Sequence, residues 1–422
     1  MRPVFSLRRS VGILATTTIV SQATNAALVL VQSHFYSPAS VGFLANVLSV
    51  ATILSPLCSM QFPFAIPQQR DRREIAEIVV MTAISVATMF LVLNGAVAIL
   101  ALTYLRTDTA REIAFFGLVS APFLILFDLG RMLAARDGAF REVGLQSATF
   151  AFFRAIIQVI GGVLGGSQFW LVAGETFGRF GALHVTRKSA VKIWRVGRSV
   201  RLHLSAAMRA NWRFPVISLP STLVDNLGGY LPPILIANLY GLDVAGLLFL
   251  AQRVVSFPIV LLVQSTADVI HVRAAQLAQS HGQSLLRFVL KTAAVFFILG
   301  VAVAIVMAGC VTGFWSMVFS ARWHAAQEMA YALIITGILQ TACGPITRIL
   351  IVTNRQALKL IFDFTYLAAG CSPVLLSWAG CHLDAQGAVW SIAIGYTGAY
   401  AVYLAIILYA ASRPIDLERV RP

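Results

Sequence analysis

The sequence predicts an all-α integral membrane protein with twelve transmembrane helices in two six-helix halves. The first observation is compositional: 58% of the 422 residues are hydrophobic, 12% are charged, and the mean hydropathy is +0.81. A soluble domain carries about 25% charged residues, so most of this chain must face lipid. The second observation is a basic segment between two apolar halves, and the third is the distribution of Lys and Arg among the loops.

The apolar segments set the number of helices. A hydrocarbon core about 30 Å thick requires roughly 20 apolar residues per transmembrane helix. Arg8 and Arg9 precede an apolar run that continues to Val31, which favours an uncleaved first span over a signal peptide. The twelve predicted spans cover residues 10–32, 40–66, 77–104, 113–134, 143–164, 167–186, 214–238, 244–268, 286–308, 326–347, 358–378 and 387–410.

Residues 187–213 form the basic segment, which we call the basic belt. It holds eight Lys and Arg and no Asp or Glu; the eight are Arg187, Lys188, Lys192, Arg195, Arg198, Arg201, Arg209 and Arg213. Cytoplasmic loops carry such an excess of Lys and Arg. We therefore predict an N-terminal lobe at 1–186, a basic cytoplasmic linker at 187–213 and a C-terminal lobe at 214–422.

The remaining charges agree with this orientation. With both termini cytoplasmic, the inner segments hold 26 of the 32 Lys and Arg, the outer loops hold three, and three lie within spans. Six spans per half make the halves parallel repeats. A shift of 204 residues supports the repeat, because it aligns Tyr36 with Tyr240 and Gly42 with Gly246.

Two predicted spans carry polar faces. The first contains Thr16, Thr17, Thr18, Ser21, Gln22, Thr24 and Asn25, and the seventh contains Ser218, Ser221, Thr222, Asp225 and Asn226. Polar residues are costly in lipid, so these faces should line a water-filled cavity between the halves. The alternative is hydrogen bonding between helices, which contributes about 0.6–2 kcal/mol per contact.

Five ionisable residues lie deep in predicted spans: Arg154, Glu175, Arg179, Asp225 and Arg253. Glu175 and Arg179 are four residues apart, so they share a helix face as a salt bridge or as part of a functional site. Arg154 has no acidic neighbour at helical spacing and is the strongest candidate for function. Arg253 could instead pair with Asp225. Three cations against two anions suit an anionic group such as a phosphate.

The candidate substrate-binding residues are Arg154, Arg179, Arg253, Gln22, Asn25 and Asn226. Nothing in the sequence indicates an enzyme: it has no GxxxxGK[ST] phosphate loop and no His/Cys metal cluster, and the predicted outer loops are short. We expect no cofactor and no metal. Nucleic-acid binding is disfavoured, because the basic residues form short clusters between apolar runs.

Several motifs resemble one family. In the C-terminal half these are FPVISLPS at 214–221, LP at 231–232, LYG at 239–241, AGL at 245–247 and AQRVVSFP at 251–258; in the N-terminal half they are YSP at 36–38, VGF at 41–43, LSP at 54–56 and FAIP at 64–67. The chain resembles the Wzx-type polysaccharide and O-antigen flippases of the multidrug/oligosaccharidyl-lipid/polysaccharide exporter superfamily. One departure is QFPF at 61–64, where family members often carry an Arg-Tyr-Glu-like patch.

The resemblance implies two six-helix bundles facing each other around a V-shaped cleft, with alternating access. It implies transport of a lipid-linked, pyrophosphate-bearing oligosaccharide across the bacterial inner membrane. Glu175 or Asp225 would couple transport to H⁺ or Na⁺, and a polysaccharide polymerase and chain-length proteins would be partners, together with membrane lipid.

Four alternatives remain. A cation-coupled multidrug exporter of the same superfamily would need a more acidic cleft. A major-facilitator transporter should carry a Gly-Asp-Arg loop after its second span, which is missing from residues 68–77. A membrane glycosyltransferase or polymerase should carry a larger outer loop. In a non-transporting scaffold, the buried charges would be purely structural.

Overall fold

The computed structural model describes residues 4–69, 71–103, 107–199, 202–280, 282–353 and 355–413. Side chains are described from Val20 onward, except at 101, 264, 265, 268, 272, 278–280, 282–284 and 356. All regular secondary structure in these residues is helical, which confirms the predicted all-α class. The chain divides into two units, Met1–Asn226 and Leu227–Pro422, and the boundary falls inside helix α8 (Leu219–Tyr240). The three-part division at 187 and 214 stays a prediction.

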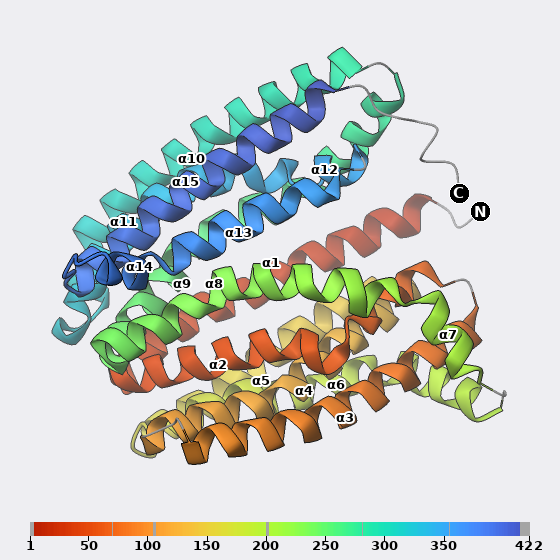
Figure 1. Cartoon of the computed structure of the whole chain (residues 1–422), viewed down its shortest axis with the longest axis horizontal. Coiled ribbons are helices and arrows are strands. Elements are labelled where there is room, and N and C mark those ends of the chain that lie inside the picture. Colours follow the sequence, from red (N-terminus) through yellow and green to blue (C-terminus); the bar gives the residue numbers. More distant parts are fainter. Residues whose placement is uncertain are drawn as a thin grey trace. The chain divides into compact units, whose positions relative to one another are not determined.

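The N-terminal unit is built from long helices that pack side by side. Helix α5 packs against α1 and α6, and α4 packs against α2 and α6 (Figure 1). Two short segments, the 3₁₀ turn η1 and the π-helical turn η2, interrupt the longer helices. The elements are α1 (Val4–Phe35), α2 (Pro38–Ser59), η1 (Phe62–Gln68), α3 (Arg72–Thr103), α4 (Asp108–Arg136), α5 (Phe140–Val163), α6 (Gln168–Ser199), α7 (Leu204–Ala210), η2 (Phe214–Ser218) and the start of α8.

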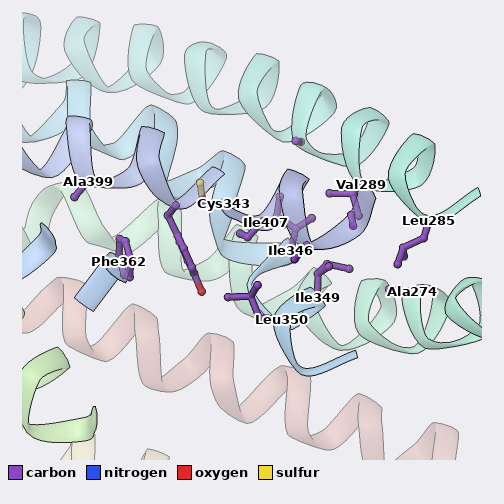
Figure 2. Close-up of a cluster of buried hydrophobic side chains, with 14 residues drawn as sticks. Ala274, Leu285, Val289, Cys343, Ile346, Ile349, Leu350, Phe362, Ala399 and Ile407 are labelled. Carbon is purple, nitrogen blue, oxygen red and sulfur yellow. The ribbon is translucent and has the colours of Figure 1, made fainter. Parts of the chain in front are cut away.

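The C-terminal unit has a core formed largely by α11 and α15. Helix α11 packs against α9, α10 and α15, and α13 packs against α15. Figure 2 shows one buried cluster of this unit, in which Phe362, Cys343 and Ile407 come from three different helices. The elements after α8 are α9 (Leu242–Ser280), α10 (Gly282–Val318), η3 (Ala321–Trp323), α11 (His324–Cys343), η4 (Gly344–Ile346), α12 (Ile349–Val352), η5 (Gln356–Leu358), α13 (Lys359–Gly370), α14 (Ser372–Trp378) and α15 (Ala385–Ser412).

Three helices begin at side-chain caps that the sequence supplies. The Ser37 hydroxyl accepts from Ser40 N at 3.1 Å at the start of α2, and Thr107 and Asp384 cap α4 and α15 in the same way. Such caps satisfy backbone N–H groups that lack a partner in the first turn. Helix α2 ends at Ser59, where Met60 and Gln61 have φ of 49° and 59°. The second predicted span, 40–66, therefore continues as η1 and not as one helix.

A helix lies at each of the twelve predicted positions, but fewer meet the requirements for crossing a membrane. Among the described residues, eight helices are long and apolar enough, or nine if the pair α13 and α14, bent by 60°, counts as one span. Helix α1 is described in side-chain detail only from Val20. Helices α6 and α8 contain Glu175, Arg179 and Asp225, which lower their apolar content. The helices agree with a multi-pass membrane protein, while twelve spans and cytoplasmic termini stay predictions; the residues from 414 onward lie outside the described part.

Small residues allow α5 and α6 to approach closely. A Cβ atom added at Gly161 would lie 2.2 Å from Trp170 Cβ on α6, and one added at Gly174 would lie 2.6 Å from Gln158 Cγ on α5. Close approach of this kind is typical of helix pairs in membranes, where small residues permit van der Waals packing. The glycines thus set the distance across which the polar side chains of α5 and α6 meet.

Replacement of Gly161 by alanine is expected to lower the free energy of unfolding by about 1–3 kcal/mol, because the methyl group would overlap the Trp170 side chain. Unfolding in mixed micelles with increasing SDS would measure the loss. Gly309→Ala is the matched control, since nothing lies within 4 Å of a Cβ at that helical position. Equal stability of the two variants would contradict the proposed packing role of Gly161.

Candidate functional site

A charged cluster lies inside the N-terminal unit, between α5 and α6. Arg154 Nη1 lies 3.0 Å from Glu175 Oε1, and Arg179 Nη1 lies 3.0 Å from Glu175 Oε2. Arg154 is 6% exposed and Glu175 is 2% exposed, so the ion pairs are shielded from solvent. We call Arg154, Glu175 and Arg179 the Arg–Glu–Arg cluster. With two cations and one anion, it has a formal charge of +1.

The sequence predicted only part of this arrangement. The ion pair between Glu175 and Arg179 follows from their spacing of four residues on one helix, and Arg179 also donates to the Glu175 carbonyl at 2.8 Å. Arg154, in contrast, has an acidic partner on the neighbouring helix, which spacing along its own helix could not reveal. The close approach of α5 and α6 brings this pair together.

The Arg154 side chain connects the cluster to α1. Its Nη2 donates to Asn25 Oδ1, and its Nε–H is buried with no hydrogen-bond acceptor among the described residues. The guanidinium groups of Arg154 and Arg179 both contact the Phe150 ring, with Cζ atoms 4.9 and 4.7 Å from its centroid. Cation–π contacts stabilise each cation but do not neutralise it. The cluster therefore keeps a positive charge, and the Arg154 Nε–H remains without an acceptor among the described residues.

A second polar group, which the sequence reading did not select, continues along the same helices. Gln158 Nε2 donates to the Leu171 carbonyl at 2.8 Å, and Gln158 Oε1 accepts from Gln32 Nε2 at 2.8 Å. The Tyr36 hydroxyl donates to the Gln158 carbonyl at 2.6 Å. Gln158 lies one helical turn after Arg154, and this spacing was the signal that could have identified it. These bonds fix α1, α5 and α6 relative to one another.

The other predicted site residues lie on helices other than α5 and α6. Gln22 is half-buried on α1, and Asn226 Nδ2 donates to the Thr52 carbonyl of α2 at 2.9 Å. Arg253 lies on α9 of the C-terminal unit, where its Cζ is 4.4 Å from the Phe249 centroid. Its predicted pairing with Asp225 would join the two units and stays a prediction, as does the cleft between the halves.

The C-terminal unit contains a buried ion pair and a stacked pair of tyrosine rings. The Asp363 side chain is 0% exposed, and its Oδ1 lies 2.7 Å from Lys359 Nζ. Nearby, the rings of Tyr366 and Tyr396 stack with centroids 4.2 Å apart. The Tyr396 hydroxyl donates to the Gly228 carbonyl of α8 at 2.6 Å. A carboxylate can be buried here because an ammonium group compensates it.

The fold was compared with solved structures. The lipid II flippase MurJ, in an inward closed conformation, matches 95% of this chain and 87% of its own, with a TM-score of 0.69 and 10% identity. An outward-facing multidrug resistance MATE family transporter of the MOP superfamily matches 98% and 97%, with a TM-score of 0.62 and 14% identity. This chain shares their fold. A MOP superfamily transporter from Pyrococcus furiosus also matches, over 96% of both chains with a TM-score of 0.56 and 13% identity.

These comparisons show a fold shared with the flippase and the exporters, and the resemblance to one family stays a prediction. At 10–14% identity these similarities do not separate the flippase branch from the drug-exporter branch. No protein-family model and no curated protein sequence matches the chain. Among the described residues, no group of three His, Cys, Asp or Glu side chains could hold a metal ion. The Arg–Glu–Arg cluster supplies the charged groups of the candidate site.

Proposed function

We propose that this protein is a flippase of the bacterial inner membrane that moves a lipid-linked, pyrophosphate-bearing oligosaccharide by alternating access. The observation that carries the proposal is the positive charge of the buried Arg–Glu–Arg cluster within a MOP fold. A pyrophosphate with attached sugars cannot cross hydrocarbon unaided, because its polar groups would lose their hydrogen bonds to water. Buried guanidinium groups offset that cost for an anionic headgroup.

Arg154 is the residue that would contact the headgroup. A guanidinium has five N–H donors, and Arg154 directs donors of Nη1 and Nη2 at Glu175 and Asn25 while its Nε–H has no acceptor in the described structure. In the proposed cycle, the bond from Arg154 to Asn25 opens, and phosphate oxygens replace the amide oxygen. Arg179 remains with Glu175 and keeps that carboxylate neutralised.

The same contacts bear on ion coupling. Both Glu175 oxygens lie 3.0 Å from guanidinium nitrogens, so both are already engaged in ion pairs with Arg154 and Arg179. Of the two candidates named from the sequence, we therefore propose Asp225 as the coupling residue. Its exchange for Asn would remove any dependence of transport on the coupling ion.

The substrate class can be tested with the purified chain in proteoliposomes. A fluorescent polyprenyl-pyrophosphate oligosaccharide, quenched by dithionite in the outer leaflet, would report flipping. We expect faster loss of the protected fluorescence than in protein-free vesicles, and no flipping of a neutral lipid with the same fluorophore. Absence of flipping in both inward and outward ion gradients would contradict the proposal.

A second candidate is a multidrug exporter of the same superfamily. The length of the chain favours this candidate, because the match covers a larger share of the outward-facing MATE transporter, 97%, than of MurJ, 87%. Uptake of a fluorescent lipophilic cation into the same proteoliposomes, driven by a proton or sodium gradient, would support this alternative. The positive cluster disfavours it, since a cationic drug would be repelled.

A further inference from the structure

The outward face of α6 changes its chemistry along the helix. Phe177 and Phe180 are 58% and 59% exposed, as expected for side chains that face lipid. On the following turns the same face carries basic residues, beginning with Arg187 and Lys188. At 1.5 Å per residue, Arg187 lies about 10 Å beyond Phe180 along the helix. The polar headgroup layer lies directly outside the hydrocarbon core, so a residue this far beyond the lipid-facing phenylalanines reaches the headgroups.

The basic belt is folded onto the N-terminal unit. Helix α6 continues through it to Ser199, and α7 follows. The inward face of α6 is buried: Ile193 joins Leu204 and Ala207 of α7 in a hydrophobic cluster with η1, α3 and α4. Buried Asn211 accepts from Gln69 Nε2 at 3.3 Å. These contacts bury one face of the belt, and its described basic residues are exposed on the other side.

Most of the basic residues that the structure describes in the belt form no ion pair with a described acidic residue. The belt itself contains no Asp or Glu, and Lys192 reaches Asp137 at 3.7 Å. Arg198 instead stacks on Trp194, with Cζ 4.2 Å from the ring centroid. The remaining exposed basic residues make no ion pair with the described residues: Arg187, Lys188, Arg195, Arg209 and Arg213. This charge is available for an external anion.

Exposed apolar side chains lie among the basic ones. Trp194, Met208 and Trp212 are 57%, 48% and 47% exposed. Tryptophan is enriched at membrane interfaces, where its ring lies among headgroups and its N–H can still bond. A soluble polyanion would not require apolar side chains beside the charges, nor a charged face continuous with lipid-facing phenylalanines. The combination favours lipid over nucleic acid or an acidic protein.

We propose that the basic belt binds the headgroups of anionic phospholipids in the leaflet at this end of α6. Clustered Lys and Arg next to a membrane helix attract anionic lipids, and each residue adds to the affinity. This binding does not depend on the identity of the transported substrate. It would hold the end of α6 at the membrane surface and so fix the depth of the N-terminal unit.

The test uses the full chain in a neutral detergent, with phosphatidylglycerol or phosphatidylcholine added. We expect phosphatidylglycerol to raise the unfolding temperature more than phosphatidylcholine does, and 0.5 M NaCl to reduce that difference. In the double variant Arg187→Gln/Arg195→Gln, the half-saturating phosphatidylglycerol concentration should increase about 30-fold. Arg187→Lys/Arg195→Lys should retain most of the effect, which separates lost charge from misfolding.

The matched control is Arg111→Gln/Arg322→Gln, which removes two exposed arginines from segments predicted to lie on the opposite side of the membrane. This control should respond to phosphatidylglycerol like the unaltered chain. The proposal is overturned if both lipids stabilise equally, if the belt variant keeps its response, or if inorganic phosphate or a short RNA stabilises the chain as well as phosphatidylglycerol does.

Discussion

Replacement of Glu175 by glutamine is expected to lower the free energy of unfolding by about 3–5 kcal/mol. The carboxylate contacts both Arg154 and Arg179 at 3.0 Å, and glutamine would leave two guanidinium groups in a buried site without a counter-charge. Both cations contact the same Phe150 ring, so they lie close to each other. Without the Glu175 carboxylate, their mutual repulsion would no longer be offset. SDS-induced unfolding in mixed micelles would measure the loss.

A second substitution shows whether Glu175→Gln acts through the lost charge or through the changed side-chain shape. Arg154→Met alone should cost less than Glu175→Gln, because Arg179 still neutralises Glu175. In the double variant Glu175→Gln/Arg154→Met, one uncompensated charge is removed and part of the stability should return. Asp108→Asn is the surface control: its carboxylate pairs with Arg111 in an exposed position and should contribute less than about 1 kcal/mol. A loss below 1 kcal/mol for Glu175→Gln would mean that the cluster is not compensated as described.

Replacement of Arg154 by alanine is expected to reduce transport at least about 10-fold while the protein still folds. The variant removes the net positive charge of the cluster and the unused Nε–H donor, yet leaves Glu175 paired with Arg179. A hydrogen bond to a charged group contributes about 1.5–3 kcal/mol, which corresponds to a tenfold or larger effect. The proteoliposome flipping assay would measure the rate per folded molecule.

Two further variants make this measurement specific. Arg154→Lys keeps the charge without the planar fork, so it should retain a part of the activity. Arg131→Ala removes an exposed arginine of α4 that lies 3.8 Å from Asp128, and its transport should be unchanged. Normal transport by Arg154→Ala would retire the assignment of the headgroup site to this residue.

The predicted spans show which structural features local sequence patterns can predict and which they cannot. Apolar composition located helices at the predicted positions, because burial of an apolar face in lipid is a property of each segment by itself. It did not locate the break after Ser59, where two non-glycine residues adopt positive φ, or the bend between α13 and α14. A proline stands next to each place, Pro63 at the start of η1 and Pro373 at the start of α14, but a proline alone does not show whether a helix bends or ends.

Ion pairs within one helix could also be predicted from the sequence. Glu175 and Arg179 are neighbours by helix geometry alone, so four-residue spacing was sufficient to join them. The burial of Asp363, in contrast, could not be predicted from the sequence. The compensation by Lys359 was also available from four-residue spacing, but only packing shows that the carboxylate is fully enclosed.

The sequence by itself determined a lipid-facing helical chain, with its charges gathered in a basic belt and a few isolated ionisable residues. These are properties of composition and of spacing along single helices. Only the tertiary structure decided that Arg154 meets Glu175 and Asn25, and that the belt lies folded on α3 and α4. Such contacts join residues more than twenty positions apart, and they exist because glycines and side-chain shapes set how closely the helices approach.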